Sequence, residues 1–245
     1  MTSAGEAPPP RARAFGWKTA IAAGLIGAAA GAAAMAAGSG YFVRSYLLGN
    51  PEVIPEAMEL LQAREEAKVV DTHRAALETP FEGAWAGARD GDVVLVEFFD
   101  YACGYCRKSN PEVDRLLAED KRLKVVWREW PVLGANSEAA AAASLAAARA
   151  GKFKLFYDKL FALGRPTPEA VVEAQRGVGI TAEQVAQISA SPIFQRELAK
   201  NYQLARALNA SGTPTFVVGD RIFQGAVGYE ALKDAIAEAR EGRKG

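Results

Sequence analysis

Residues 92–106 read Asp-Val-Val-Leu-Val-Glu-Phe-Phe-Asp-Tyr-Ala-Cys-Gly-Tyr-Cys, and this stretch decides the fold. Its first half is apolar at nearly every position, which indicates a central strand covered on both faces. Two cysteines follow three residues apart, where the strand gives way to a helix that we expect to run from Cys103 to about residue 118. The stretch therefore predicts a strand, a turn with two thiols, and a helix.

The position of Cys103 favours a reactive thiol. The thiolate is the nucleophilic form of cysteine, and the free amides and dipole of a helix N-terminus stabilise an anion. Cys106 lies one turn further on, close enough to attack a mixed disulfide formed at Cys103. We therefore expect Cys103 to be the exposed nucleophile, Cys106 the buried resolving thiol, and the Cys103–Cys106 disulfide the redox centre, with no separate cofactor.

Other uses of the two cysteines fit less well. A disulfide between them would close a ring too small to stabilise the fold much. A structural zinc site needs four ligands, and the chain has no third cysteine and a single histidine, His73. We therefore predict no zinc site. Two unrelated buried thiols, and a pair of thiolates that binds Cu(I), remain as alternatives.

Glu97 interrupts the apolar strand. A charge on a covered strand is costly unless it is paired or takes up a proton. A carboxyl group with a raised pKa would suit transfer of the Cys106 proton, through a water molecule. The alternative is that Glu97 points outward at the end of its strand.

The rest of the chain predicts an α/β unit with a helical insertion. Residues 123–130 form a second strand, joined to the first by the helix, so the two are parallel. A helical block follows over about 136–210, with Asn136 or Ser137 capping its run of alanines. Residues 215–219 and 222–223 then form a hairpin, and residues 229–240 a last helix. The tight turn before residue 215 makes a cis Thr213–Pro214 bond plausible.

The N-terminal region predicts an export or membrane segment. Residues 1–18 carry three basic residues, and residues 19–43 carry no charge over a length that can span a bilayer. We expect a cytoplasmic tail at 1–18 and an anchor at 19–43 that leaves the remainder in the periplasm. A cleaved signal peptide, with a small-x-small site at 34–36, and a buried soluble helix are the alternatives. Residues 44–78 form a helical linker.

Composition excludes one broad class of function. The chain of 245 residues has 29 basic and 29 acidic residues, and 50% of its residues are hydrophobic. This balance lacks the basic surface of a nucleic-acid-binding protein, so we expect no nucleic-acid partner.

Three motifs in order resemble the DsbA-like branch of the thioredoxin superfamily. They are residues 94–106, Arg128-Glu-Trp-Pro-Val-Leu-Gly134 and Gly212-Thr-Pro-Thr-Phe-Val-Val-Gly219. The resemblance covers residues 79–240 and implies a thioredoxin-like fold with an inserted helical domain. It implies catalytic roles for Cys103, Cys106 and Glu97, a cis Thr213–Pro214 bond, and substrate contacts by Thr213, Pro214, Gly104 and Tyr105.

A narrower resemblance is to ScsC-type proteins and related bacterial disulfide isomerases. It rests on Tyr46-Leu-Leu-Gly-Asn-Pro-Glu-Val-Ile54 followed by a helix, which looks like their oligomerisation segment. It implies a homo-oligomeric protein disulfide isomerase or reductase that acts on unfolded or misoxidised exported proteins and exchanges electrons with a membrane partner. The Gly-Tyr dipeptide differs from the Pro-His of strongly oxidising relatives, so we expect a less oxidising pair. A disulfide-forming oxidase and a Cu(I)-binding copper-tolerance protein are the alternatives.

Overall fold

The computed structural model describes residues 16–242 and divides the chain into two compact units that meet between Leu60 and Leu61. The first unit contains α1 (Trp17–Gly49) and the beginning of α2 (Val53–Glu78). Asn50 ends α1, because both its side-chain amide and its backbone N–H donate to the Tyr46 carbonyl, each at 2.9 Å. The segment predicted as a helical linker at 44–78 therefore consists of the end of α1 and the whole of α2.

The segment predicted as an anchor lies within α1. In the part of the chain that the structure describes, no helix combines the length and the apolar character needed to cross a membrane. The predicted membrane tether at 19–43 is therefore not supported. Residues 1–15, most of the predicted cytoplasmic tail, lie outside the described residues.

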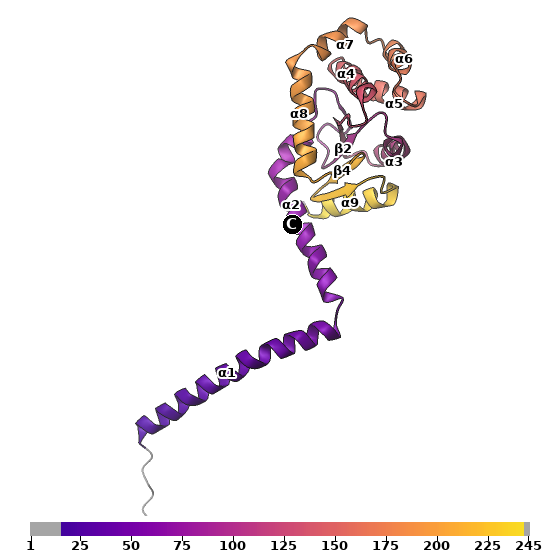
Figure 1. The fold of residues 1–245 in the computed structure, drawn as a ribbon. Helices are drawn as coiled ribbons and strands as arrows, with labels where there is room; N and C mark the ends of the chain where they lie inside the picture. Colours follow the sequence, from indigo (N-terminus) through magenta and orange to yellow (C-terminus); the bar gives the residue numbers. More distant parts are fainter. Residues whose placement is uncertain (1–15, 243–245) are drawn as a thin grey trace, which may run out of the picture. The chain divides into compact units, whose positions relative to one another are not determined.

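The second unit is built on a five-stranded sheet (Figure 1). The strand order is β1-β3-β2-β4-β5, and only β2 and β3 are parallel. Their bounds are β1 Trp85–Gly87, β2 Val93–Phe99, β3 Leu123–Glu129, β4 Thr215–Val218 and β5 Arg221–Gln224. All seven residues of β2 are buried, as its continuous apolar run predicts. The parallel crossover through α3 (Gly104–Glu119) and the C-terminal hairpin are both as predicted.

Five helices lie between β3 and β4, so the predicted helical insertion is confirmed. They are α4 Ala135–Arg149, α5 Phe153–Leu163, α6 Pro168–Val178, α7 Ala182–Ser189 and α8 Pro192–Ala207, and α9 (Tyr229–Gly242) ends the described chain. The predicted cap of α4 by Asn136 or Ser137 is wrong. The helix begins at Ala135, and no side chain caps it. The residue before it, Gly134, has a φ of 111°, a backbone conformation that favours glycine. Together with the sheet, these helices give the predicted thioredoxin-like α/β class.

Side chains alternate between the two faces of the sheet and form two cores. Leu95 and Phe99 on β2 join Trp127 on β3 in a core with helices of the insertion, α3 and α9. Val96 and Phe98 face the other way, into a second core that includes Val70 and Leu77 of α2 and Leu204 of α8. Figure 1 shows the sheet between α8 on one side and α3 on the other. Each face of β2 therefore meets a different set of helices.

Candidate active site: two unequal thiols beside a buried acid

Cys103 stands at the start of α3. It is the capping residue of that helix, and its own N–H donates to the Asp100 carbonyl at 3.0 Å. Both cysteines are free, so the structure shows the reduced pair. The predicted position of Cys103 at a helix N-terminus is confirmed.

The surroundings of Cys103 favour its thiolate. Its pKa is lowered from 9.0 to about 5, chiefly because the Cys106 thiol donates a hydrogen bond to it, and further because the N–H groups of Cys106 and Tyr105 point at it. The predicted exposure is wrong in degree: Cys103 is only 7% exposed, whereas Gly104 and Tyr105 are exposed. The Thr213 carbonyl oxygen, 3.1 Å from Cys103 Sγ, covers it and accepts a hydrogen bond from the thiol form.

Cys106 lies in the opposite environment. It is fully buried, and burial raises the pKa of its thiol far above the ordinary value. The nearby carboxyl group of Glu97 raises it further. At neutral pH one thiol is therefore ionised and its neighbour, one helical turn along, holds its proton.

Glu97 points into the core, so the alternative of an outward carboxylate is wrong. It is 0% exposed, and its Oε2 accepts hydrogen bonds from Trp127 Nε1 at 2.8 Å and from the Tyr157 hydroxyl at 3.3 Å. Its Oε1 is buried without a hydrogen-bond partner among the described residues. Burial raises the pKa of Glu97 to about 8 despite these two donors. The carboxyl group can therefore gain or lose a proton near neutral pH.

The Thr213–Pro214 bond is cis, and the turn lies beside Cys103. It is placed there by the sheet: β4 starts at Thr215, which pairs with Phe98 near the carboxyl end of β2. Pro214 is buried, and its carbonyl accepts from the Gly225 N–H at 2.8 Å. The structure thus brings Thr213 and Pro214 to Gly104, Tyr105 and the thiols, and contact with substrate remains a prediction for these four residues.

Asp100 holds this end of the sheet together and was not anticipated from the sequence. Its carboxylate accepts from the Ala102 N–H at 2.7 Å and from the N–H groups of Val132 and Leu133 at 2.8 and 3.0 Å. It thereby ties the loop before Cys103 to the loop after β3. An acid directly after a buried strand and two residues before a turn N–H was the available signal.

Three more residues of the site were also not predicted from the sequence: Trp127, Tyr157 and Asn110. They surround Glu97 from β3, α5 and α3, and all are buried. Only Trp127 carried a local signal, since it falls in the second buried strand. Tyr157 lies in the helical insertion, where no periodic pattern distinguishes a residue that reaches the sheet.

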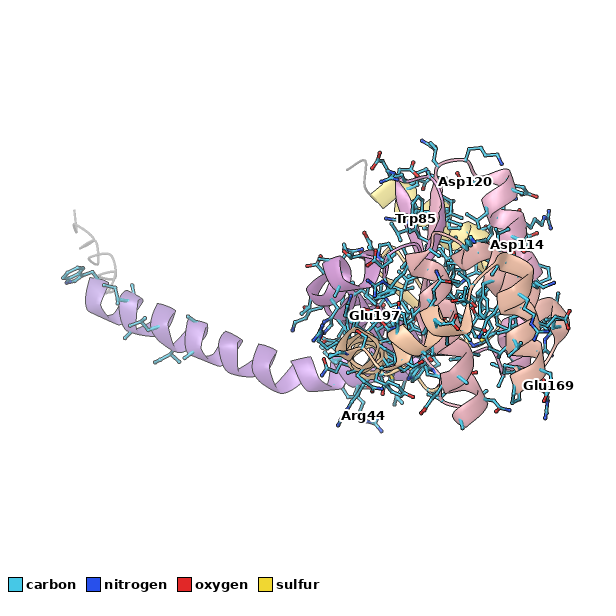
Figure 2. All side chains as sticks on the ribbon, turned by 90° about the horizontal axis from the view of Figure 1, so that it is seen from above. Arg44, Trp85, Asp114, Asp120, Glu169 and Glu197 are labelled. Atoms are coloured by element: carbon cyan, nitrogen blue, oxygen red, sulfur yellow. The ribbon has the colours of Figure 1, made fainter. Side chains whose placement is uncertain are left out.

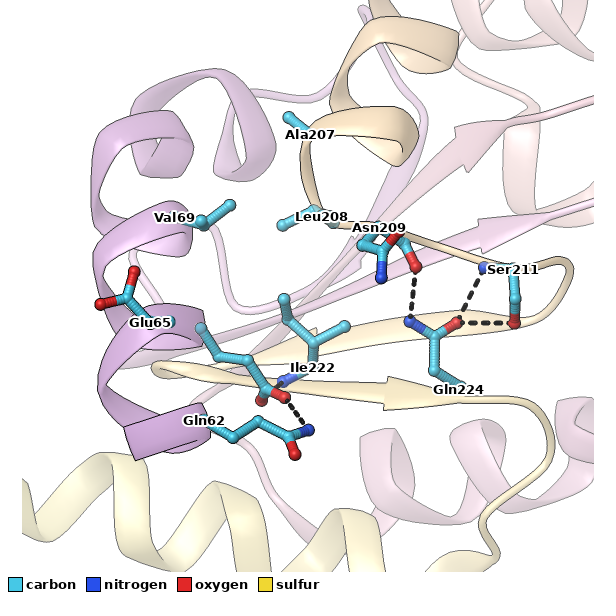
Figure 3. A pocket seen from close by; sticks show the side chains of 10 residues that line it. Gln62, Glu65, Val69, Ala207, Leu208, Asn209, Ser211, Ile222 and Gln224 are labelled. Atoms are coloured by element: carbon cyan, nitrogen blue, oxygen red, sulfur yellow. Dashed lines mark hydrogen bonds between the residues drawn. The ribbon is translucent and has the colours of Figure 1, made fainter. Parts of the chain in front are cut away.

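A hollow of about 550 Å³ lies elsewhere in the second unit, between α2 and β5 (Figure 3). Glu65 and Glu66 form one side of it, and Gln224 on the other side accepts a hydrogen bond from the Ser211 N–H at 3.1 Å. Its lining contains neither cysteine nor Pro214, so it is separate from the thiol site.

Comparison with solved structures supports the fold. A thioredoxin-like oxidoreductase from Silicibacter pomeroyi is 39% identical, with a TM-score of 0.62 over 64% of this chain and 91% of that one. The structure of Proteus mirabilis ScsC in a transitional conformation is 26% identical, with a TM-score of 0.64 over 86% of this chain and 97% of that one. Both cover nearly the whole of the solved protein.

Among curated proteins, the Na(+)/H(+) antiporter NhaA 1 of Salinispora arenicola is 29% identical over 161 residues. The match takes in 64% of this chain and 25% of the antiporter, so the chain spans about a quarter of that relative's length.

Two family models match. The model of the copper resistance protein ScsC N-terminal domain matches residues 40–68, as the resemblance of residues 46–54 predicts. The model of the DSBA-like thioredoxin domain matches residues 94–237, which include both cysteines, Glu97 and the cis proline. The chain belongs to the family of DsbA-like thioredoxin domains, with an N-terminal segment of the ScsC type.

Proposed function

We propose that this chain is a thiol–disulfide oxidoreductase of exported proteins, and that it works as a disulfide isomerase or reductase. One observation carries the proposal: the inequality of the two thiols, with Cys103 ionised at a helix start and Cys106 buried and protonated behind it. An attacking thiol must be ionised at working pH, whereas a resolving thiol must stay unreactive until it is needed.

The exchange follows from this inequality. The Cys103 thiolate attacks a substrate disulfide, forms a mixed disulfide and expels one substrate thiolate, which takes a proton from solvent. Cys106 then gives its proton to Glu97 and attacks Cys103 Sγ, so the Cys103–Cys106 bond forms and the second substrate thiolate leaves. Two electrons pass from the dithiol to the substrate. In isomerisation a different thiolate of the substrate attacks the mixed disulfide instead. A new substrate disulfide forms, Cys103 leaves as the thiolate, and no net electrons are transferred.

The dipeptide between the cysteines supports isomerase or reductase over strong oxidase, whereas the pKa of Cys103 favours neither. The corresponding thiol has a pKa of about 7 in thioredoxin, a reductant, and about 3.5 in DsbA, a strong oxidant. Cys103, at about 5, lies between them. The residue before the second cysteine is Tyr105, whose side chain is 66% exposed and supplies no cation to the thiolate. A disulfide-forming oxidase remains the alternative.

We propose that the substrates are unfolded or misoxidised proteins in the periplasm. Exposed apolar side chains support a protein substrate: Tyr105, Val132 and Leu133 are 66%, 40% and 55% exposed. Asp100 fixes the backbone of Val132 and Leu133 relative to the loop before Cys103. An isomerase also needs its pair kept reduced, so we propose a membrane thiol–disulfide partner as electron donor.

We propose further that residues 40–68 assemble the chain into a homo-oligomer. The match to the ScsC N-terminal domain supports this, and so does the exposure of Ile54, Met58 and Leu60, which are apolar yet 49%, 67% and 54% exposed. A second copy of the segment would cover these side chains. Light scattering of a variant lacking residues 41–70 should give the mass of a monomer, and an unchanged mass would refute the proposal.

A copper-binding role is the second candidate, favoured by the name of the matching ScsC domain. Two thiolates can bind Cu(I). Titration of the reduced protein with Cu(I), and of a Cys103→Ser variant as control, tests it. Binding that depends on Cys103 would favour a copper role, and equal weak binding by both proteins would exclude it.

The main experiment compares refolding of a scrambled protein with refolding of the same protein reduced. An isomerase restores the activity of the scrambled form, whereas an oxidase acts on the reduced one. Cys106→Ala should accumulate mixed disulfides with substrate, and Cys103→Ala, its matched control, should form none. If Cys103→Ala keeps activity and Cys106→Ala traps nothing, the proposed function is wrong.

A further inference from the structure

The hydroxyl group of Tyr157 has two acceptors and one proton. Its oxygen lies 2.6 Å from Asn110 Oδ1 and 3.3 Å from Glu97 Oε2. Asn110 is on α3, one helical turn beyond Cys106, and both Tyr157 and Asn110 are buried. Because the shorter contact goes to Asn110, the proton of Tyr157 is directed mainly to Asn110, and Glu97 receives only the longer, weaker hydrogen bond.

This competition controls how well the Glu97 carboxylate is stabilised. A buried carboxylate needs several hydrogen-bond donors to offset the loss of water. Trp127 supplies one good donor at 2.8 Å to Oε2, and Oε1 has no partner within the described structure. Any donation from Tyr157 would also go to Oε2, so Oε1 is the oxygen left to take a proton.

The charged and titratable groups around Glu97 come from several elements. Asp114 of α3 and the Cys103 thiolate add negative charge that opposes its ionisation. The Glu97 carboxylate in turn raises the pKa values of Cys106 and Tyr101, whose burial already favours their protonated forms. The influence of Asp114, which lies at the surface (Figure 2), is reduced because Lys154 pairs with it at 2.8 Å.

We propose that Asn110 and Tyr157 are positioning residues of the thiol exchange: Asn110 accepts the stronger hydrogen bond of the Tyr157 hydroxyl and so leaves Glu97 short of donors, ready to accept the Cys106 proton. This inference rests on the proposed function. In the step concerned, the S–H bond of Cys106 breaks and Glu97 Oε1 gains the proton. The Cys106 sulfur then bonds to Cys103 Sγ while the substrate thiolate leaves.

Two variants change the competition in opposite directions. Asn110→Leu removes the preferred acceptor, so Tyr157 turns its proton to Glu97 and the carboxylate becomes easier to form. Tyr157→Phe removes the donor altogether, so the carboxylate becomes harder to form. In the double variant Asn110 has nothing to act through, and the result should equal that of Tyr157→Phe alone.

The measurement is the reaction of the reduced full-length protein with an aromatic disulfide such as DTNB. Attack by Cys103 releases one coloured thiolate, and attack by Cys106 on the mixed disulfide releases the second. We expect the second phase in wild-type protein to accelerate as pH rises through the pKa of Glu97, about 8. Asn110→Leu should move this profile down by about one pH unit, the size expected for one full hydrogen bond to a charged group. Tyr157→Phe removes only the weaker hydrogen bond and should move the profile up by less.

The outcomes separate this inference from the proposed function. Shifts in the same direction, or none, would overturn the positioning roles, since a general loosening of the core would move both variants alike. A second phase unaffected by Glu97→Gln would overturn the role of the acid while leaving the thiol exchange intact. A wild-type protein without a first phase that depends on Cys103 would overturn the proposed function itself. Far-ultraviolet circular dichroism confirms that each variant is folded.

Discussion

Two buried ionisable side chains lie on neighbouring strands, and their hydrogen-bonding environments are opposite. Glu97 on β2 faces the core shared with α3 and the insertion, where one of its oxygens lacks a partner. Arg128 on β3 belongs to the opposite face, where its guanidinium donates to the carbonyl groups of Ala76, Leu77 and Thr79 and to the side chains of Glu197 and Asn201. The acid is left short of hydrogen bonds, while the base is saturated.

The difference shows that Arg128 stabilises the fold, whereas Glu97 is suited to proton transfer. Arg128 meets the carbonyl groups at the end of α2, where a helix leaves acceptors unpaired and its dipole favours a cation. Its remaining donors reach α8, with Glu197 at 3.2 Å. It therefore fastens two helices to the sheet. Glu97 fastens little, and its incomplete set of donors lets it change protonation state at working pH.

Removal of Arg128, whose hydrogen-bond donors are all used, should have the largest effect on stability. Arg128→Met leaves the last carbonyl groups of α2 buried without a donor and leaves Glu197 with only Lys200, 3.8 Å away, so we expect the free energy of unfolding to fall by about 3–5 kcal/mol. Urea denaturation measures this. Arg221→Met, which removes an exposed pair with Glu238, is the control and should cost no more than about 1 kcal/mol. Equal losses in the two variants would mean that Arg128 is not an anchor.

Removal of the Glu97 carboxyl group should instead change how stability depends on pH. The pKa of Glu97 is 4.5 in an unperturbed chain and about 8 when folded, so between these values the folded state keeps a proton that the unfolded state has lost. The carboxyl group therefore lowers stability as pH rises through this window, by at most about 1.4 kcal/mol per pH unit. From pH 5 to pH 8 the stability of Glu97→Gln should therefore rise relative to that of the reduced wild-type protein.

Denaturation of both proteins at several pH values checks this sign. A stability difference that is constant with pH would show that Glu97 does not keep its proton on folding. Other groups with shifted pKa values that do not interact with Glu97, such as Glu129, are present in both proteins and cancel in the comparison.

The smallest effect should come from an exposed pair at the same helix. Arg74 of α2 pairs with Asp220 in the β4–β5 turn, whose side chain is 62% exposed. Asp220→Ala should change the free energy of unfolding by only about 0.2–1 kcal/mol, because water screens such a pair. Urea denaturation at low and high salt measures it. A loss comparable to that of Arg128→Met would show that α2 is held by its surface rather than by the buried guanidinium.

The sequence predicted those parts of the site that follow from local pattern. The apolar run of β2 identified a central strand, and the Cys103 spacing placed a thiol at a helix start. Glu97 stood out because a charge within such a run is costly to bury. The cis bond at Thr213–Pro214 was expected from its turn and from family resemblance.

The remainder depends on tertiary contacts that no local pattern encodes. Tyr157 meets Glu97 across 60 positions of sequence, and Asn110 meets Tyr157 across 47. Arg128 meets Leu77 of α2 and Glu197 of α8 across 51 and 69 positions of sequence. The exposure of Cys103 was overestimated for the same reason, since the Thr213 carbonyl that covers it comes from 110 residues away.

The inequality of the two thiols is tested most directly by measuring the ionisation of each. The reduced protein is alkylated briefly with iodoacetamide over a range of pH, and mass spectrometry of peptides follows each cysteine. We predict that Cys103 reacts with a midpoint near pH 5, and that Cys106 stays unreactive far above neutral pH. A midpoint for Cys103 near 9, its ordinary value, or earlier reaction of Cys106, would contradict the account.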